Sequence, residues 1–228
     1  MSQVEKSIIE ERLSTINYDR FSSLLMQIES VININKNINN ILEIGPGNQF
    51  FSNMIKMLGY DIKTNDVRKR TNPDYYGDIR KINIEEKFDL IVAFEVLQHL
   101  PFEELSHTLN KLKKMTNHYI LLSLPYQIHS FSFNIKLPNI FFPRKLKLDF
   151  FRKKFSINFF WEKPRKKDTP YELLSQREDF WNPHYWEIGR KSFPKSKVID
   201  EIKSSGLSIV WEKHNPSFPM HYFILLSI

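Results

Sequence analysis

The sequence predicts an α/β fold with a doubly wound, mostly parallel sheet, and two observations support this prediction. Between residues 41 and 125, short apolar segments that suit buried strands alternate with segments whose apolar residues recur at helical spacing. Glycines or acidic residues directly follow several of these strands, which is where ligands of such sheets bind. At 228 residues the chain is long enough for one domain with a substantial core.

The first predicted strand, turn and helix occupy residues 41–59. Ile41–Ile44 is a short apolar strand that contains Glu43. Gly45-Pro46-Gly47 interrupts it, and glycines let the backbone come close to a ligand because no Cβ fills the space. The helix that follows has its apolar residues at helical spacing and ends at Gly59: Phe50, Phe51, Met54, Ile55 and Leu58.

A second strand, Tyr60–Thr64, leads to Asp66, about 20 residues past the glycine turn. A carboxylate at the tip of this strand can accept hydrogen bonds from both hydroxyls of a ribose. Phe50 stands where a dinucleotide fingerprint has its third glycine, which favours a nucleoside ligand without a pyrophosphate. A Gly-Pro-Gly turn can also be a turn and nothing more, so the later elements have to support the site.

The next elements bring further polar residues to the same predicted edge. Asp78-Ile79 closes a weak third strand or turn, and Phe88–Glu95 is a near-continuous apolar strand, as expected for a parallel sheet covered on both faces. A helix marked by Leu105 to Met115 and a strand over Tyr119–Leu124 follow. The carboxyl ends of parallel strands meet at one edge, so we expect the following residues to converge there: Gly45, Gly47, Asp66, Asp78 and Glu95.

The flanks complete a single predicted domain over residues 1–228. Residues 1–40 are an N-terminal helical segment, with its helix over roughly 8–31, and 41–125 are the core. Residues 126–190, rich in aromatic and basic side chains, form an inserted lid that we expect to be partly helical. Residues 191–228 contain a helix capped by Gly206 and two strands, Leu207–Trp211 and His221–Leu226. Only nine residues separate these strands, so the pair should be antiparallel.

Composition narrows the functional classes. The chain has no cysteine, which excludes disulfides and thiolate chemistry but leaves the compartment open. No apolar run is long enough to suggest a membrane-spanning helix, and the N-terminus lacks a signal-peptide pattern, so we expect a cytoplasmic protein. Much of the net charge of +7 lies between Arg144 and Lys167. The abundance of Lys, Asn, Ile and Phe also fits the codon bias of an AT-rich genome.

Taken together, these motifs resemble those of the class I S-adenosylmethionine (SAM)-dependent methyltransferases. LEIGPG at Leu42–Gly47 looks like their first motif, and FDLIVAFEVLQHLP at Phe88–Pro101 is similar to their fourth-strand motif. HYWEIG at His184–Gly189 looks like a motif of bacterial members often encoded among surface-polysaccharide genes. One residue departs from the pattern: the third glycine of the first motif would fall at Gln49.

The resemblance implies a Rossmann-like sheet of seven strands with an antiparallel C-terminal strand, and SAM as the cofactor. It implies that Glu43 meets the cationic methionine end of SAM directly or through water, that Asp66 holds the ribose, and that Asp78 and the backbone of Ile79 meet the adenine. The full set of implied cofactor-binding residues is Glu43, Gly45, Pro46, Gly47, Asp66, Asp78, Ile79, Phe94 and Glu95.

His99 is the candidate general base for an oxygen nucleophile, four residues after Glu95 on the turn that leaves the fourth strand. A structural histidine that bonds the neighbouring loop is an equally good interpretation. His184 with Glu187 is the alternative catalytic pair, and His184, Trp186 and Glu187 are the candidate substrate residues. The competing interpretation is a packing motif in which Trp186 anchors the lid to the sheet. The other five histidines lack acidic or histidine partners at ligand spacing, so we expect no metal site.

We therefore expect a SAM-dependent methyltransferase with a small-molecule acceptor, most plausibly a glycan or glycan precursor that is O-methylated. The basic, aromatic insert has three interpretations: a packed lid, a cap for a phosphorylated or nucleotide-linked sugar, or an RNA or membrane-surface patch. Two rival functions stay open. One is an RNA methyltransferase, which the absence of an Asn-Pro-Pro-Tyr-type tetrapeptide after the fourth strand disfavours. The other is a non-catalytic SAM-binding module.

Overall fold

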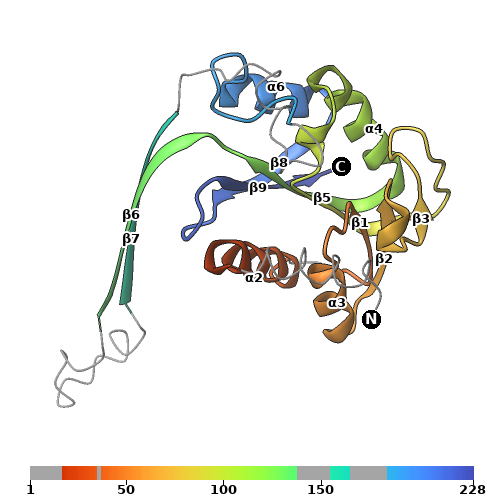
Figure 1. Cartoon of the computed structure of the whole chain (residues 1–228), viewed down its shortest axis with the longest axis horizontal. Coiled ribbons are helices and arrows are strands. Elements are labelled where there is room, and N and C mark those ends of the chain that lie inside the picture. Colours follow the sequence, from red (N-terminus) through yellow and green to blue (C-terminus); the bar gives the residue numbers. More distant parts are fainter. Residues whose placement is uncertain (1–16, 35–36, 138–154, 165–183) are drawn as a thin grey trace, which may run out of the picture.

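The computed structural model describes residues 17–34, 37–137, 155–164 and 184–228. Its centre is a seven-stranded sheet in the order β3-β2-β1-β4-β5-β9-β8 (Figure 1). Neighbours among β1 to β5 are parallel, and β9 runs antiparallel to both β5 and β8. The strands are β1 Asn40–Ile44, β2 Asp61–Asp66, β3 Tyr75–Tyr76, β4 Phe88–Phe94, β5 Thr116–Pro125, β8 Ser208–His214 and β9 His221–Ser227. The prediction of a doubly wound, mostly parallel seven-stranded sheet is confirmed.

Helices cover both faces of this sheet. In Figure 1, α2 (Tyr18–Ile32) and α3 (Phe50–Met57) lie on one side of the sheet, and α4 (Leu105–Met115) and α6 (Lys195–Ser204) lie on the other. Strand β4 shows why its sequence is apolar throughout. Leu90 and Val92 belong to the core on the α2–α3 side, whereas Ile91 and Ala93 belong to the core on the α4–α6 side.

Two elements differ from their predicted bounds. Strand β3 has only two residues, Tyr75–Tyr76, and ends before Asp78. Helix α2 begins at Tyr18, where Asn17 is the N-cap and accepts a hydrogen bond from the backbone N–H of Arg20 at 2.9 Å. The first part of the predicted helix, residues 8–16, lies outside the described residues. Within the described residues, no helix has the length and apolar composition needed to cross a bilayer.

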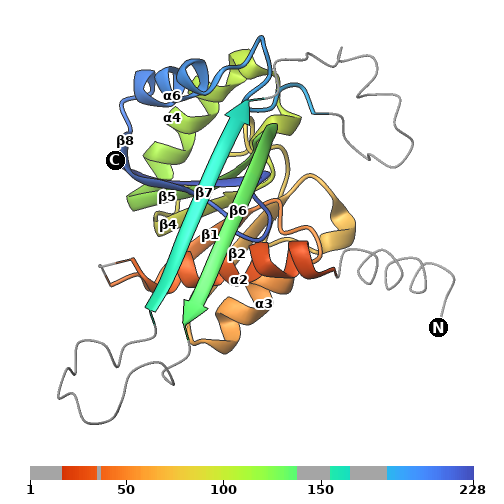
Figure 2. The ribbon, with the colours of Figure 1, turned by 90° about the vertical axis from the view of Figure 1, so that its left-hand side faces the viewer.

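The insert departs most from its prediction. Its described residues form an antiparallel pair, β6 (Ile128–Leu137) and β7 (Phe155–Pro164), instead of the partly helical segment expected. The pair extends away from the body as an arm in Figure 1, and Figure 2 shows it in front of the central sheet. Since β6 begins three residues after β5 ends, the arm leaves from the carboxyl edge of the parallel strands. The remainder of the expected lid, 138–154 and 165–183, lies outside the described residues.

Candidate active site

The glycine turn after β1 is positioned by contacts that need glycine. Gly45 has φ +67° and its N–H donates to the carbonyl of Asn65 at 2.8 Å, which joins the turn to β2. A Cβ on Gly45 would lie 2.7 Å from Cγ2 of Val96, so no larger residue fits without a shift. Pro46 is buried, whereas Gly47, at φ +51°, is exposed. The turn therefore presents exposed backbone at the carboxyl edge of the sheet.

Gln49 takes the left-handed conformation that a glycine would adopt most easily. Its φ is +64°, and it forms the N-cap of α3 without a side-chain cap bond. Its backbone N–H donates to the carbonyl of Pro46 at 2.7 Å, and its side-chain amide donates to the backbone carbonyl of Thr71. The turn thus keeps a glycine-like backbone at the position where the sequence departs from the methyltransferase motif.

Glu43 is a buried acid beside this turn. Only 4% of the residue is exposed, and its carboxyl atom Oε2 has no hydrogen-bond partner among the described residues. Burial, aided by the nearby charge of Asp66 and opposed by the hydroxyl of Ser52 and by Lys56, raises the pKa of Glu43 to about 8. An unpaired buried acceptor is costly, so this carboxyl suits a cationic or hydrogen-bond-donating ligand.

Asp66 ends β2, next to the glycine turn, as predicted. Its carboxylate oxygen Oδ1 accepts from the backbone N–H of Arg68 at 3.0 Å, and Oδ2 accepts from the hydroxyl of Thr71 at 3.1 Å. The Arg68 guanidinium also pairs with it, at 3.3 Å. These bonds fix the orientation of the carboxylate at the strand end. A ribose would share or replace the two side-chain bonds.

Asp78 and Ile79 follow β3 and are linked to Asp66 through the backbone, because the N–H of Gly77 donates to the carbonyl of Asp66 at 3.0 Å. Asp78 forms an ion pair with Arg80 at 2.7 Å, and the hydrogen bonds from Arg80 lower the pKa of Asp78 although partial burial opposes them. The side chain of Ile79 is buried in the core on the α4–α6 side. Its backbone, not its side chain, is therefore the part available to a ligand.

Phe94 and Glu95 stand at the end of β4. The ring of Phe94 packs edge-on against Phe51 of α3, with centroids 4.9 Å apart. Glu95 has a left-handed backbone (φ +54°), and its carboxylate accepts from the hydroxyl of Ser123 at 2.9 Å and from the amide of Gln98 at 3.4 Å. Burial, partly offset by Ser123 and by the nearby His184, raises the pKa of Glu95 to about 7. A strained, half-buried acid that titrates near neutrality is typical of functional sites.

The two predicted histidine candidates lie together. His99 ends the short 3-10 helix η2 (Leu97–His99), and its ring meets the ring of His184 edge-on, with centroids 4.8 Å apart. Nδ1 of His184 is hydrogen-bonded to Glu187 at 2.8 Å, and Nε of Arg190 donates to the other carboxylate oxygen of Glu187 at 2.6 Å. Burial opposes ionisation of Glu187, but His184 and Arg190 together lower its pKa. A carboxylate that holds one nitrogen of a histidine is the arrangement that orients general bases.

Trp186 anchors this segment and does not face the site. It is 1% exposed, and its indole N–H donates to the carbonyl of Leu100 at 3.1 Å. On either side of it, the N–H of Tyr185 donates to the carbonyl of Gln98 at 2.8 Å and the N–H of Ile188 donates to that of Pro125 at 3.0 Å. The residues 184–190 thus connect the loop after β4 to the end of β5. The buried Trp186 side chain fits the packing interpretation of this motif, and its contact with a substrate stays a prediction.

Three residues of this cluster were missed by sequence reasoning: Gln98, Ser123 and Arg190. The sequence could have indicated Ser123, because it is the polar residue in the otherwise apolar run Tyr119–Leu124. Within η2, Gln98 is the residue whose side chain donates to Glu95, and the proposed role of His99 stays a prediction. In the described residues, no group of three or more His, Asp or Glu side chains is arranged to hold a metal ion.

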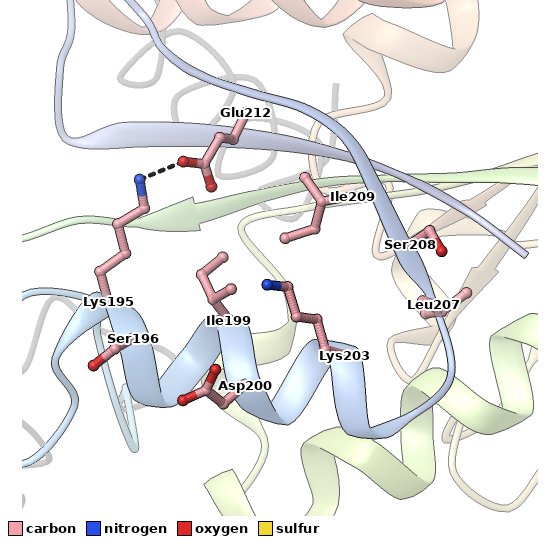
Figure 3. Close-up of a pocket in the computed structure, with 9 residues that line it drawn as sticks. All are labelled: Lys195, Ser196, Ile199, Asp200, Lys203, Leu207, Ser208, Ile209 and Glu212. Atoms are coloured by element: carbon pink, nitrogen blue, oxygen red, sulfur yellow. Dashed lines mark hydrogen bonds and ion pairs between the residues drawn. The ribbon is translucent and has the colours of Figure 1, made fainter.

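A separate open hollow lies between α6 and β8, with Lys195, Lys203 and Ile209 along it (Figure 3). Lys195 is paired with Glu212 there at 2.5 Å. The hollow contains none of the predicted site residues. It runs beside the helix on the α4–α6 face, whereas the acids and histidines described above gather at the carboxyl edge of the sheet. The carboxyl edge is therefore the candidate active site.

Solved structures with a similar fold are methyltransferases. A SAM-dependent methyltransferase from Clostridium acetobutylicum ATCC 824 aligns with a TM-score of 0.56 and 12% identity over 98% of both chains. The fold is that of the class I methyltransferases. The glycopeptide N-methyltransferase MtfA complexed with S-adenosyl-L-homocysteine (SAH) aligns at 0.56 and 10% identity, over 93% of this chain and 91% of MtfA. Magnesium protoporphyrin IX methyltransferase (ChlM) from Synechocystis PCC 6803 with bound SAH aligns at 0.52 and 12%, over 93% and 88%.

At these identities the likeness concerns the fold. No family model matches the sequence. The comparison with curated proteins also finds no match. The assignment of a function therefore depends on the chemistry of the residues at the carboxyl edge.

Proposed function

We propose that this protein is a SAM-dependent methyltransferase that acts on a small-molecule acceptor. The observation that carries the proposal is the unpaired, buried Oε2 of Glu43 beside a glycine turn in which position 45 has no room for a Cβ. SAM has a cationic amino-acid end that needs such an acceptor, a ribose that suits Asp66, and no pyrophosphate. The residues present fit this ligand.

In this proposal each residue of the edge has one task. Glu43 binds the ammonium group of the methionine end, directly or through water, and the backbone of Gly45–Gly47 lies against the same part of the ligand. Asp66 orients the ribose, and Asp78 with the backbone of Ile79 contacts the adenine. Phe94 and Glu95 line the path from the cofactor to the acceptor.

When bound, SAM would supply a methyl group on a sulfonium, whose transfer to an acceptor atom breaks the carbon–sulfur bond and releases SAH without covalent catalysis by the protein. The protein has to hold the acceptor close to that carbon and to take up the proton of a hydroxyl acceptor. His99 is our proposed base. His184 lies against it and is oriented by Glu187, so it is the second candidate for the same proton. Glu95, with its pKa near 7, is a further proton acceptor in the cluster.

We further propose that the acceptor is a hydroxyl of a glycan or glycan precursor, which rests on the resemblance of residues 184–189 and on the basic insert. The rival proposals are methylation of RNA and SAM binding without turnover. Salt-sensitive binding of RNA oligonucleotides would favour the first. SAH binding without methyl transfer to any acceptor would favour the second.

The first experiment is calorimetric titration with SAH, with NAD as the control ligand. We expect micromolar binding of SAH and no binding of NAD. Binding of NAD alone would refute the proposal. Once SAH binding has been measured, methyl transfer from labelled SAM to a panel of nucleotide-sugars and glycans is assayed to identify the acceptor.

Single substitutions then test the proposed base. His99→Ala should leave SAH affinity nearly unchanged and lower kcat by about 10²- to 10⁴-fold, the range typical of a lost general base. His184→Ala is compared under the same conditions, and whichever variant loses the acidic limb of the pH–rate profile, where protonation inactivates a base, identifies the base. Unchanged turnover in both variants would remove the histidines from the mechanism.

A further inference from the structure

The arm formed by β6 and β7 has one face that is apolar along almost its whole length. Directly opposed residues of an antiparallel pair share a face, and faces alternate along each strand. Four alternate pairs in the register, from Phe131–Trp161 to Leu137–Phe155, are apolar on both strands. The three pairs between them, on the other face, are polar at five of six positions.

The body of the protein does not cover this apolar face at Trp161, the apolar residue of the face whose exposure the structure describes. The side chain of Trp161 is 50% exposed. Figure 1 shows the arm projecting away from the helices and the central sheet, and within the described residues β6 and β7 form a separate two-stranded sheet. An isolated two-stranded hairpin is marginal in water, so a face of this kind is expected to be covered by a partner.

The charge of the chain selects the partner. Residues 144–167, which include β7 and part of the sequence between β6 and β7, contain ten lysines and arginines and two acidic residues, so this stretch carries +8. The whole chain carries +7, so the remaining residues are close to neutral. A basic stretch continuous in sequence with an apolar, aromatic face complements a surface whose outer layer is negatively charged and whose interior is apolar.

A second copy of the chain fits less well. Ten residues per strand give a length of about 33 Å, and two strands give a width of about 10 Å, so the face covers a footprint of roughly 330 Å². Two such faces bury about 650 Å², which is below the roughly 1,000 Å² expected of a specific interface. Pairing would also bring two strongly basic stretches into one assembly.

We propose that the apolar face of the β6–β7 arm docks the protein on an anionic lipid membrane. The arm lies in the interface and does not insert across the bilayer, because no described strand pairs with the outer edges of this two-stranded sheet, and backbone groups at such edges need water. The arm leaves from the carboxyl edge of the sheet, so docking brings the candidate active site to the membrane surface. The docking itself does not depend on the chemistry proposed for that site.

The test is co-sedimentation of the full-length protein with vesicles of phosphatidylcholine alone or with about 30% phosphatidylserine, at low and high salt. We expect binding to the anionic vesicles that weakens with salt, and little binding to phosphatidylcholine. Phe133→Ser/Phe159→Ser alters one directly opposed apolar pair and should lower partitioning at least about tenfold. Asn134→Ser/Asn158→Ser, the adjacent pair on the other face, is the matched control and should bind within about twofold of wild type.

A second measurement does not depend on the double variant folding. Lipids brominated in the acyl chain should quench wild-type tryptophan fluorescence, and Trp161→Phe, which keeps an aromatic ring at this position, should bind vesicles but lose most of the quenching. Absence of vesicle binding by wild type, or an equal loss in both double variants, would overturn the proposal. So would a dimer in sedimentation equilibrium that Phe133→Ser/Phe159→Ser dissociates, or salt-sensitive RNA binding in place of vesicle binding.

Discussion

Replacing Glu43 by Gln should make the ligand-free protein more stable and its ligand binding weaker. Burial raises the pKa of Glu43 to about 8, compared with the ordinary value of 4.5. At pH 7 the folded chain therefore keeps a proton that the unfolded chain has released. The difference of about 2.5 pH units corresponds to about 3 kcal/mol of lost stability. Gln removes this cost, but its amide has to be buried in the same place.

The net gain expected for Glu43→Gln is about 2 kcal/mol, or about 4–8 °C in Tm for a chain of this length. The sign depends on pH. Below about pH 4.5 the acid is protonated in both states, so the gain should vanish there and only the cost of burying the amide should remain. The stability of wild type then falls relative to the variant as the pH rises, until the folded-state pKa near 8 is reached.

Thermal unfolding of both proteins between pH 5 and 8 measures this difference, with Glu103→Gln, an exposed acid, as the control. Titration with SAH completes the assay. The ammonium group of the ligand favours the ionised form of Glu43, and loss of the acceptor formed in this way should weaken binding by about 1.5–3 kcal/mol, roughly 10- to 100-fold. A lower Tm for Glu43→Gln at pH 7, or a Tm difference that does not change with pH, would refute the argument from burial. Unchanged SAH affinity would remove Glu43 from the ligand site.

Three further substitutions test neighbouring features. Gly45→Ala should lower Tm by about 4–8 °C, because the new Cβ meets Val96 at 2.7 Å and φ is +67°; an unchanged melting curve would show that the turn adapts. Asp66→Asn should weaken SAH binding about 10- to 100-fold in calorimetry. Arg68→Gln is the control, because it removes only the ion-pair partner of Asp66. Equal losses of SAH affinity in both variants would indicate that Asp66 acts through folding and not through contact with the ribose. Glu95→Gln should raise stability at pH 8 by about 1–2 kcal/mol but not at pH 4.5, since its pKa of about 7 is raised by burial; denaturant titration at both pH values decides.

The sheet was predictable because a strand that is buried on both faces has apolar residues at successive positions of its sequence. Strand β4 and residues 119–124 of β5 are apolar at nearly every position, since alternate residues enter different cores. The convergence of Gly45, Asp66 and Glu95 followed from one general rule, that parallel strands bring their carboxyl ends to one edge. No knowledge of packing was needed for this step.

The bonds within the site were not predictable, because they depend on register and on contacts between distant segments. Ser123 meets Glu95 only because Phe94 of β4 is in register with Ser123 of β5. The burial of Trp186 depends on a hydrogen bond to Leu100, 86 residues away in the sequence. Spacing along the chain carries no information about either distance.

The arm shows a different kind of failure. Phe131, Phe133, Ile135 and Leu137 alternate strictly with other residues, which is the period of a strand. The same regularity in β7 is hidden by Phe160, an apolar residue on the otherwise polar face. A segment dense in aromatic residues therefore looked aperiodic until the pairing of the two strands defined its faces.

Gln49 links the glycine turn to the loop that orients Asp66, and this link explains how the turn tolerates a residue larger than glycine. A left-handed backbone costs a residue other than glycine about 1 kcal/mol, which is comparable to the net value of one hydrogen bond. The Gln49 side chain makes such a bond to the carbonyl of Thr71, and the hydroxyl of Thr71 in turn donates to Asp66. Glycine at this position would relieve the backbone but release the loop that orients Asp66. Gln49 in place of glycine therefore costs a small backbone strain, but its side chain connects the turn, through Thr71, to Asp66, the acid proposed to hold the ribose.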